Sequence, residues 1–362
     1  MRLTRGRLLV LAAGALVAGM LFAWSGLLNI AASSGHWAIT NWFLHYVMRQ
    51  SVETHSMAIE APPLDDPALI HRGAGHYATG CTPCHGAPGQ ERSAVARAMT
   101  PPPPFLPDRV PEWDPNELFW IVQHGVKFTG MPAWAAPERA DEVWAMVAFL
   151  LQLPTMEPER YRELALGELA NHEIDDAGLE ALVDPFEPLL ADCARCHGRD
   201  GAGRGLGAFP KLAGQSEDYL LATLQAYALG ARRSGIMQPA VTALSEAAMR
   251  QLARHYANSG SLASDASGGG NVYGGEIARH GVPNEGIPAC VTCHEPAGKR
   301  YPAYPKLRGQ TADYLVQQLR LFKGGIRGGT AYAHIMETIA RRMSDAQILA
   351  VAGYFGSQPE PR

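Results

Sequence analysis

The stretch GIPACVTCHEPAG, residues 286–298, contains two cysteines separated by two residues, with a histidine directly after the second. The same CxxCH pattern occurs at CTPCH (81–85) and at CARCH (193–197). These three copies use all 6 cysteines of the chain, so no thiol is left over for a separate structural disulfide. We infer that each pair of thiols serves, with its histidine, one shared chemical purpose.

Paired thiols at this spacing have three ordinary uses. Thiol–disulfide exchange favours a strand-to-helix context and needs no histidine. Zinc needs four ligands, whereas one CxxCH supplies three and three copies do not pair evenly. Covalent haem attachment uses both thiols as thioether links and the histidine as an iron ligand. The threefold repetition favours three covalently bound haem c groups. Their predicted attachment residues are Cys81, Cys84, His85, Cys193, Cys196, His197, Cys290, Cys293 and His294.

The residue on the other side of each iron decides the function. An open iron binds small molecules, whereas a thioether sulfur closes the site and raises the reduction potential. Candidate methionines follow the first cysteine of each copy after 50, 44 and 46 residues, at Met131, Met237 and Met336. This near-constant separation supports His/Met ligation. The predicted iron ligands are His85, Met131, His197, Met237, His294 and Met336.

Other methionines and histidines offer alternatives. Met99, beside the proline-rich run TPPPPFLP (100–107), is a second candidate in the first copy. Three methionines occupy positions typical of core residues: Met146, Met249 and Met343. Outside the motifs, the alternative ligands are His124, His255, His280 and His334, for which surface or supporting roles are the default expectation.

A metal-bound histidine usually donates its second ring N–H to a carbonyl or carboxylate. Pro210 and Pro305 follow their motif histidines by thirteen and eleven residues, and their carbonyl oxygens are the predicted acceptors. A proline within 101–104 is expected to serve His85 in the same way.

The second and third copies belong to one repeated module. The segments FPKLAGQSEDYLLATLQAYALG (209–230) and YPKLRGQTADYLVQQLRLFKGG (304–325) align, as do 237–257 and 336–356. The final helix of each copy carries apolar residues at i, i+3, i+4 and i+7. These stripes are Val143, Met146, Val147 and Leu150; Met249, Leu252, Ala253 and Tyr256; and Ile348, Val351, Ala352 and Phe355. Ser344 and Gln347 resemble a capping box, and no segment alternates as a strand would, which predicts an all-α fold.

Composition shifts give the predicted domain boundaries. Residues 156–189 hold ten acids against two arginines, and SLASDASGGGN (261–271) has the composition of a flexible connector. The prediction is an N-terminal transmembrane anchor or uncleaved signal (1–34), a juxtamembrane segment (35–61), domain one (62–155), an acidic linker (156–185), domain two (186–262) and domain three (263–362).

The N-terminus predicts export. Arg2, Arg5 and Arg7 precede an apolar run over 8–28 that would span about 31 Å as a helix, enough to cross a bilayer core. A cleaved signal peptide is the alternative, although its apolar core would usually be only about 7–15 residues long. The basic flank predicts a cytoplasmic N-terminus. The aromatic residues in 36–55 indicate either an interfacial helix or a helix packed on domain one.

Charge excludes one class of partner. The net charge is −4, and residues 190–262 and 263–362 each carry three more bases than acids. That density is too low for a nucleic-acid-binding protein. It suits instead the steering of a charged protein partner.

These motifs resemble class I c-type cytochromes. Domains two and three, with PKLAGQ, the following YL and a methionine before LSEAAM or MSDAQI, resemble the two-haem cytochromes of the cytochrome c-four group. Domain one, with HGVKFTGMPAW and DEVWAMVAFL, resembles single-haem modules anchored in bacterial respiratory chains. The resemblance implies three to five helices per haem, His/Met ligation and a periplasmic setting at the bacterial inner membrane. One departure is Glu295, where the other copies have Gly86 and Gly198.

The resulting hypothesis is a membrane-anchored trihaem cytochrome that transfers single electrons in a respiratory chain and is a carrier, not an enzyme. Expected partners are a quinol-oxidising complex or dehydrogenase as donor and a terminal oxidase or soluble cytochrome as acceptor. One alternative is the electron-accepting subunit of a membrane dehydrogenase. Another is a haem peroxidase, which would need at least one open iron.

Overall fold

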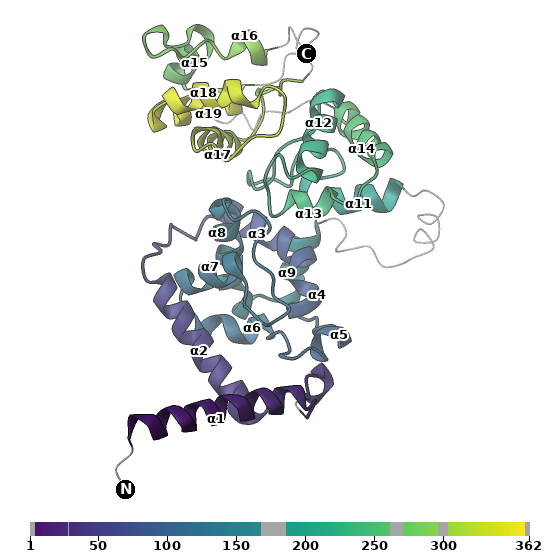
Figure 1. Cartoon of the computed structure of the whole chain (residues 1–362). Helices are drawn as coiled ribbons and strands as arrows, with labels where there is room; N and C mark the ends of the chain where they lie inside the picture. The colour runs from purple at the N-terminus through teal and green to yellow at the C-terminus, as the bar shows by residue number, and fades with distance from the viewer. Residues whose placement is uncertain (1–3, 28, 168–185, 261–270, 296–302, 359–362) are drawn as a thin grey trace, which may run out of the picture.

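The computed structural model describes residues 4–27, 29–167, 186–260, 271–295 and 303–358. Within these ranges the chain forms helices and turns and no β-strand, apart from two isolated bridges, Ala87–Gln90 and Val282–Ile287. The predicted all-α class is therefore confirmed. Figure 1 shows the helices grouped into three successive bundles above an extended N-terminal helix.

The helices fall into four groups. The N-terminal helices are α1 (Arg5–Trp24) and α2 (Ala38–Ser56). The first unit comprises α3 (Pro67–Gly80), α4 (Thr82–His85), α5 (Ala94–Arg97), α6 (Leu106–Arg109), α7 (Pro115–His124), α8 (Ala140–Gln152) and α9 (Pro158–Leu166). The second unit comprises α11 (Phe186–His197), α12 (Glu217–Ala228), α13 (Met237–Val241) and α14 (Glu246–Asn258). The third unit comprises α15 (Val272–His280), α16 (Val291–His294), α17 (Ala312–Lys323), α18 (Ala333–Arg342) and α19 (Asp345–Ser357).

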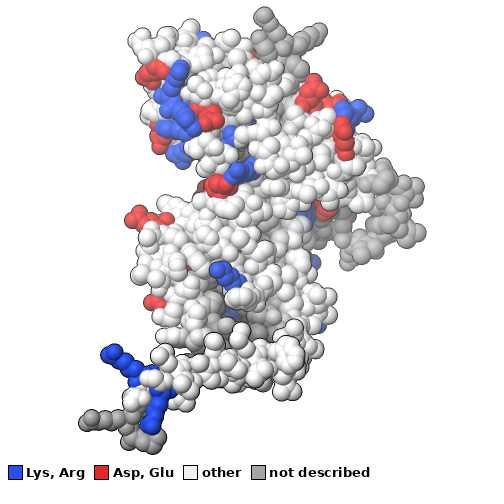
Figure 2. Space-filling view, in the orientation of Figure 1, with Lys and Arg blue, Asp and Glu red and all other residues white. Residues whose placement is uncertain are grey.

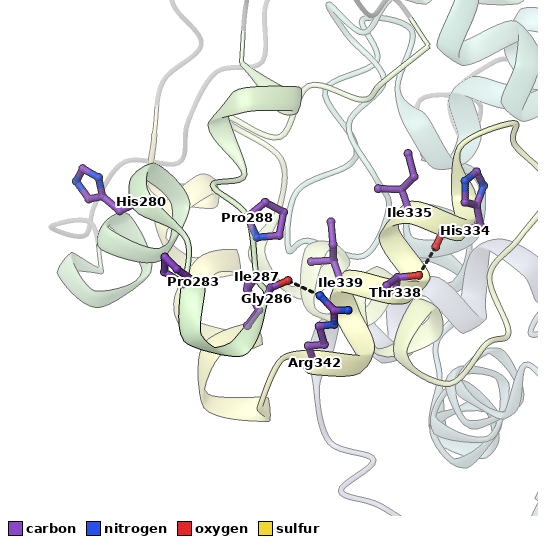
Figure 3. Close-up of a pocket in the computed structure, with 10 residues that line it drawn as sticks. All are labelled: His280, Pro283, Gly286, Ile287, Pro288, His334, Ile335, Thr338, Ile339 and Arg342. Atoms are coloured by element: carbon purple, nitrogen blue, oxygen red, sulfur yellow. Dashed lines mark hydrogen bonds between the residues drawn. The ribbon is translucent and has the colours of Figure 1, made fainter.

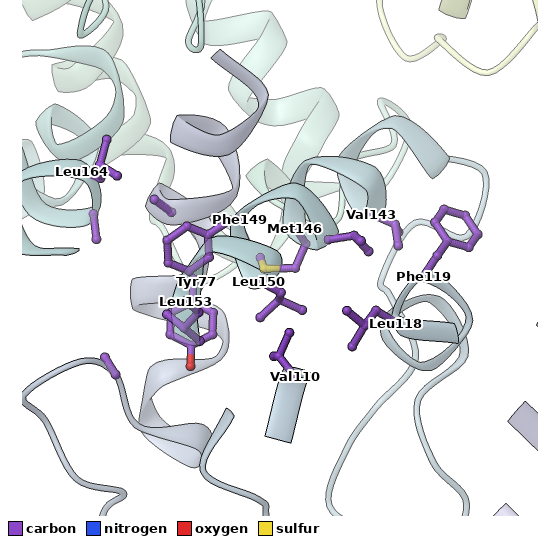
Figure 4. Close-up of a cluster of buried hydrophobic side chains, with 14 of the residues drawn as sticks. Tyr77, Val110, Leu118, Phe119, Val143, Met146, Phe149, Leu150, Leu153 and Leu164 are labelled. Carbon is purple, nitrogen blue, oxygen red and sulfur yellow. The ribbon is translucent and has the colours of Figure 1, made fainter. Parts of the chain in front are cut away.

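Each unit has its own apolar core. In the first unit α3 packs against α8, and Tyr77, Met146 and Phe149 lie at the centre of the buried cluster (Figure 4). The three predicted helical stripes are all buried, because residues spaced by three and four positions share one face of a helix. The predicted capping box is also confirmed, since Ser344 Oγ accepts the Gln347 N–H at 3.2 Å and the Gln347 side chain accepts the Ser344 N–H at 2.7 Å.

Helix α9 falls inside the segment predicted as an acidic linker, and it packs on the first unit. Tyr161 and Leu164 are buried in the core of that unit. The Tyr161 hydroxyl lies 2.8 Å from Thr82 Oγ1, one residue after the first cysteine of the motif. The structure does not describe residues 168–185 of the predicted linker or residues 261–270 of the predicted connector.

Helix α2 packs on the first unit through one half only. Its C-terminal half packs on the first unit: Val52 is buried, and the Asn116 side chain donates to the Ser56 carbonyl at 3.0 Å. Arg49 lies over the Trp113 ring at 4.7 Å. Its N-terminal half and the preceding Trp37 leave large aromatic side chains exposed: Trp37, Trp42, Phe43 and Tyr46.

Helix α1 is the one described helix that is long and apolar enough to cross a membrane. None of its residues is buried against the rest of the chain. Twenty residues at about 1.5 Å per residue give about 30 Å, the thickness of a bilayer core.

Candidate haem sites

The three motifs occupy single helical turns. The first follows α3 and forms α4, the second ends α11, and the third forms α16. The backbone N–H of His85 donates to the Cys81 carbonyl at 2.9 Å, and His294 donates to Cys290 at 3.0 Å. Because residues at i, i+3 and i+4 lie on one side of a helical turn, both thiols and the imidazole of a motif are brought together.

Each motif histidine is oriented by a proline carbonyl, as predicted from the sequence. The Nδ1-to-oxygen distances are 2.9 Å for His85 and Pro104, 3.1 Å for His197 and Pro210, and 2.9 Å for His294 and Pro305. A carbonyl oxygen only accepts, so Nδ1 carries the proton and Nε2 keeps its lone pair. This is the tautomer in which a histidine ligates a metal through Nε2.

Protonation also favours a ligand role. Burial lowers the pKa of each motif histidine, which keeps the imidazoles neutral, whereas the proline carbonyls act in the opposite direction. Burial raises the pKa of Cys81 and of Cys193 to about 12, and that of Cys290 to about 11. Thiol–disulfide exchange depends on a lowered thiol pKa, so these sites differ from exchange sites. Across the described residues, moreover, no group of three or more Cys, His, Asp or Glu side chains is arranged to hold a zinc ion.

The three candidate methionines lie at different kinds of position. Met131 is in the irregular loop between α7 and α8, Met237 begins α13, and Met336 lies in the first half of α18. All three are half-buried, whereas Met146, Met249 and Met343 are buried in the cores as expected. Met99 contacts the loop of the first candidate, because a Cβ placed on Gly130 would lie 2.1 Å from the Met99 Cε. Met99 therefore lies beside the residue that precedes Met131.

The alternative histidines have other surroundings. His255 Nε2 lies 2.8 Å from the Arg199 carbonyl, so this histidine supports the turn that follows the second motif. His124 is exposed, with its ring 5.1 Å from that of Trp120. His280 and His334 are exposed at the rim of a hollow in the third unit.

That hollow lies between α18 and the loop that leads to the third motif (Figure 3). Its volume is about 600 Å³, and its walls include Ile287, Pro288, Ile335 and Ile339. Pro288 precedes Cys290 by two residues, and Ile335 is adjacent to Met336. The apolar side chains beside the third site suit the edge of a porphyrin.

Two arginines, the buried Arg232 and the half-buried Arg327, reach across the contact between the second and third units. Arg232 donates to the Tyr314 hydroxyl at 3.0 Å, and Arg327 donates to the Tyr219 hydroxyl at 3.3 Å. Neither forms an ion pair with a carboxylate among the described residues. Removing a guanidinium from water without an anion is costly, above all for the buried Arg232, so the site suits an anionic group such as a haem propionate. Arg327 also lies close enough to His294 to lower its pKa. Sequence reasoning missed both residues, although each follows its middle helix at the same place in the repeat.

The third motif leaves its helical turn differently from the others. Gly86 and Gly198 follow their histidines with φ of 70° and 76°, a conformation that glycine adopts without strain. Glu295 has φ of −103° and pairs with Arg308. The glutamate is therefore accommodated by an extended exit, and its charge is balanced.

The family described as Cytochrome c matches residues 188–257 and 288–358, and the family described as Cytochrome C oxidase, cbb3-type, subunit III matches residues 68–150. Together these matches include all three CxxCH motifs, and the described parts of the three units are helical. The chain belongs to the class I c-type cytochromes.

The relatives of this chain include thiosulfate dehydrogenase electron acceptors and cytochromes c4. The thiosulfate dehydrogenase electron acceptor of Thiomonas intermedia (strain K12) is 38% identical over 179 residues, which cover 48% of this chain and 81% of that protein. Cytochrome c4 of Pseudomonas aeruginosa is 35% identical over 166 residues, covering 45% of this chain and 82% of the relative. The crystal structure of reduced recombinant cytochrome c4 from Pseudomonas stutzeri has 31% identity and a TM-score of 0.43, covering 48% of this chain and 97% of that one. The chain is thus an electron carrier with covalently bound haem c, and its partners are redox proteins.

Proposed function

We propose that this chain is a membrane-anchored, periplasmic cytochrome with three haem c groups that relays single electrons in a respiratory chain. The observation that carries the proposal is the repeated arrangement of the motif histidines. Each donates its Nδ1–H to a proline carbonyl, and each is followed by a half-buried methionine. Three equivalent closed sites suit electron transfer and leave no open iron for peroxidase chemistry.

The residues present fit the group that this family binds. The paired thiols of each motif would hold the porphyrin, and the motif histidine would bind iron through Nε2. Met131, Met237 and Met336 would supply the opposite ligand. Arg232 and Arg327 would neutralise propionates at the contact between the second and third units. When bound, haem supplies the one-electron chemistry, while the chain fixes the spacing and the potential.

The membrane anchor is proposed from α1. Figure 2 shows blue side chains at the start of this helix, where Arg5 and Arg7 lie, and an uncharged surface along the rest of it. Basic residues before an apolar span remain on the cytoplasmic side, which would send the haem units outward. The exposed aromatic half of α2 would then lie at the headgroup level, where indole and phenol rings are favoured.

A second candidate is the electron-accepting subunit of a dehydrogenase complex. The specific observation is the 38% identity to proteins named as thiosulfate dehydrogenase electron acceptors. Those relatives match about half of this chain, so the substrate of any associated dehydrogenase does not carry over to it.

Purification of the full-length chain from native membranes in mild detergent tests both candidates. A relay is expected to elute without a stoichiometric catalytic subunit, to be reduced by quinol-oxidising membranes and to bind neither cyanide nor carbon monoxide readily. Co-elution of a dehydrogenase would support the second candidate. Rapid binding of cyanide by one of the ferric haems would contradict closed ligation at that haem and would favour the peroxidase alternative.

A further inference from the structure

The first unit contacts the second beside the segment that carries Met237. The central residue is Glu142 in the first turn of α8, which is only 3% exposed. Four donors converge on its carboxylate: Ser234 Oγ at 2.6 Å, the Gly235 N–H at 2.6 Å, Arg139 Nη1 at 2.8 Å and Trp134 Nε1 at 3.1 Å. Two of these donors belong to the first unit and two to the second, so one buried carboxylate joins the units.

The hydroxyl of Ser234 connects the Glu142 carboxylate to the backbone of Met237. A serine hydroxyl has one proton to donate, and here Glu142 accepts it. The oxygen lone pairs then accept the backbone N–H of Met237 at 3.0 Å and that of Ile236 at 3.2 Å. The orientation of the first turn of α13 therefore depends on a carboxylate from another unit.

Steric fit reinforces the contact. A Cβ on Gly235 would lie 2.1 Å from Trp134 Nε1, so only glycine allows the loop to lie this close to the indole. Arg139, whose guanidinium also binds Asp141, donates to the Arg233 carbonyl at 2.9 Å. The segment preceding Met237 is thus held over four consecutive residues, 233–236.

The same unit also touches the thioether side of the second site. A Cβ on Gly75 of α3 would lie 3.1 Å from the Cys196 Sγ, and Arg72 donates to the Ala208 carbonyl at 3.0 Å. The third unit differs, because its position equivalent to Gly235 is His334, which is exposed. Figure 1 shows α8 and α3 directly beneath the second unit, in agreement with these contacts.

We propose that Glu142 is a positioning residue through which the first unit holds Met237 against its iron, so that the potential of the second haem is set partly by the first unit. This inference rests on the proposed ligation by Met237. Burial raises the pKa of Glu142, and the charge of Arg139 and the hydrogen bonds from Ser234 and Gly235 oppose this rise. All four donors, Arg139 among them, require an acceptor, and the carboxylate supplies it.

The test uses the full-length holoprotein carrying Glu142→Gln, Glu142→Asp or Ser234→Ala. Glutamine replaces one acceptor oxygen by an amide NH₂ group, which is itself a donor and cannot accept from the donors that face it. Ser234→Ala removes the relay while leaving the Glu142–Arg139 pair intact, so it decides the matter if Glu142→Gln folds poorly. The matched control is Glu246→Gln, an exposed ion pair with Arg250 in the second unit. The reference for the second haem is Met237→Ala.

The readouts are the absorption band of the sulfur–iron bond and a potentiometric titration that resolves the haems. Glu142→Gln and Ser234→Ala are expected to lower one potential, the one that Met237→Ala also lowers, and to weaken the band by up to about one third, the share of one haem in three. Glu142→Asp is expected to restore part of the change, and Glu246→Gln to change nothing. If wild type has the full band but both variants keep its potentials and amplitude, the inference is overturned while the proposed function stands. If wild type lacks the band, the ligation itself fails, and the inference with it.

Discussion

The side-chain amide of Gln310, in the third unit, makes two hydrogen bonds with the backbone of Lys211, in the second. Gln310 Oε1 accepts the Lys211 N–H at 3.0 Å, and Gln310 Nε2 donates to the Lys211 carbonyl at 2.9 Å. The Lys211 N–H belongs to the same peptide group as the Pro210 carbonyl, which accepts from His197. A hydrogen-bonded path therefore runs from a motif histidine to the neighbouring unit.

The reverse path is present as well. Gln215 of the second unit accepts the Lys306 N–H at 2.9 Å and donates to the Lys306 carbonyl at 2.7 Å. Lys306 follows Pro305, whose carbonyl accepts from His294. The two units thus exchange equivalent contacts, as expected for two copies of one module facing each other.

Gln310→Ala is predicted to destabilise the contact between the two units and to alter one haem. The loss of two buried hydrogen bonds should cost about 1–3 kcal/mol in the free energy of unfolding. Hydrogen bonds in a chain polarise one another, so the Pro210 carbonyl becomes a weaker acceptor and His197 a less electron-rich ligand. The potential of the second haem should therefore rise. Denaturant unfolding and redox titration measure both effects, with Gln251→Ala, at an exposed position of α14, as the control. Equal behaviour of the two variants would contradict the path.

Met131→Ala is predicted to open the first iron. The sulfur–iron band should lose about one third of its amplitude, and the potential of one haem should fall, because a thioether ligand raises it. Met99→Ala, which alters the methionine beside Gly130, is expected to leave the band intact. Absorption spectra of the two oxidised proteins measure this. The opposite pattern would assign the first site to Met99.

Acid is predicted to destabilise the first unit through His76. Burial, aided by Arg195, lowers the pKa of His76 to about 4, and its ring lies 4.9 Å from that of Trp134. The unfolded chain titrates near 6.5, so between pH 6.5 and 4 it binds more protons than the folded chain. Above pH 6.5 the burial of neutral His76 therefore leaves the free energy of unfolding unchanged. As the pH falls from 6.5 towards 4, the free energy of unfolding decreases by up to about 3 kcal/mol.

His76→Gln removes that titration. The free energy of unfolding of this variant, followed by denaturant titration at several pH values, should depend less steeply on pH over this window than that of wild type. His280→Gln, at an exposed position in the third unit, is the control and should keep the wild-type slope. A His76→Gln slope equal to that of wild type would show that another group is responsible.

Tyr161→Ala is predicted to destabilise the first unit by about 3 kcal/mol, in the range for large core residues replaced by alanine. Tyr161 is 3% exposed, its hydroxyl bonds Thr82, and its ring lies 6.1 Å from that of Tyr77. Thermal unfolding measures the effect, and Val95→Ala, at an exposed position, is the control. A change of under about 0.5 kcal/mol would indicate that α9 is only loosely attached.

Local pattern was enough to predict much of this fold. The helical stripes, the capping box at Ser344 and the proline partners of the motif histidines depend on spacing along the chain, and all are present. Helix α9 was harder to predict, because its composition is polar and acidic and only Tyr161, Leu164 and Ala165 in it are buried. Three apolar positions in a charged segment do not stand out from a linker.

The contacts between units could not be predicted from the sequence. From the sequence, Glu142 is one acidic residue in the first turn of a helix, a position where acidic residues are generally favoured. Its burial arises only because Ser234 and Gly235, more than ninety positions away, supply donors from another unit. Arg232 and Arg327 were missed for the same reason, since an arginine in a glycine-containing turn normally faces solvent.

The central claim is that three histidine-bearing CxxCH sites each hold a covalent haem with iron. Its most direct test is the intact mass of the full-length chain, produced in a host able to mature c-type cytochromes, after acid–acetone extraction of non-covalent haem. The expected mass exceeds that of the polypeptide by three haem groups, with iron present at three atoms per chain. A mass increment of fewer than three groups, or zinc in place of iron, would contradict it.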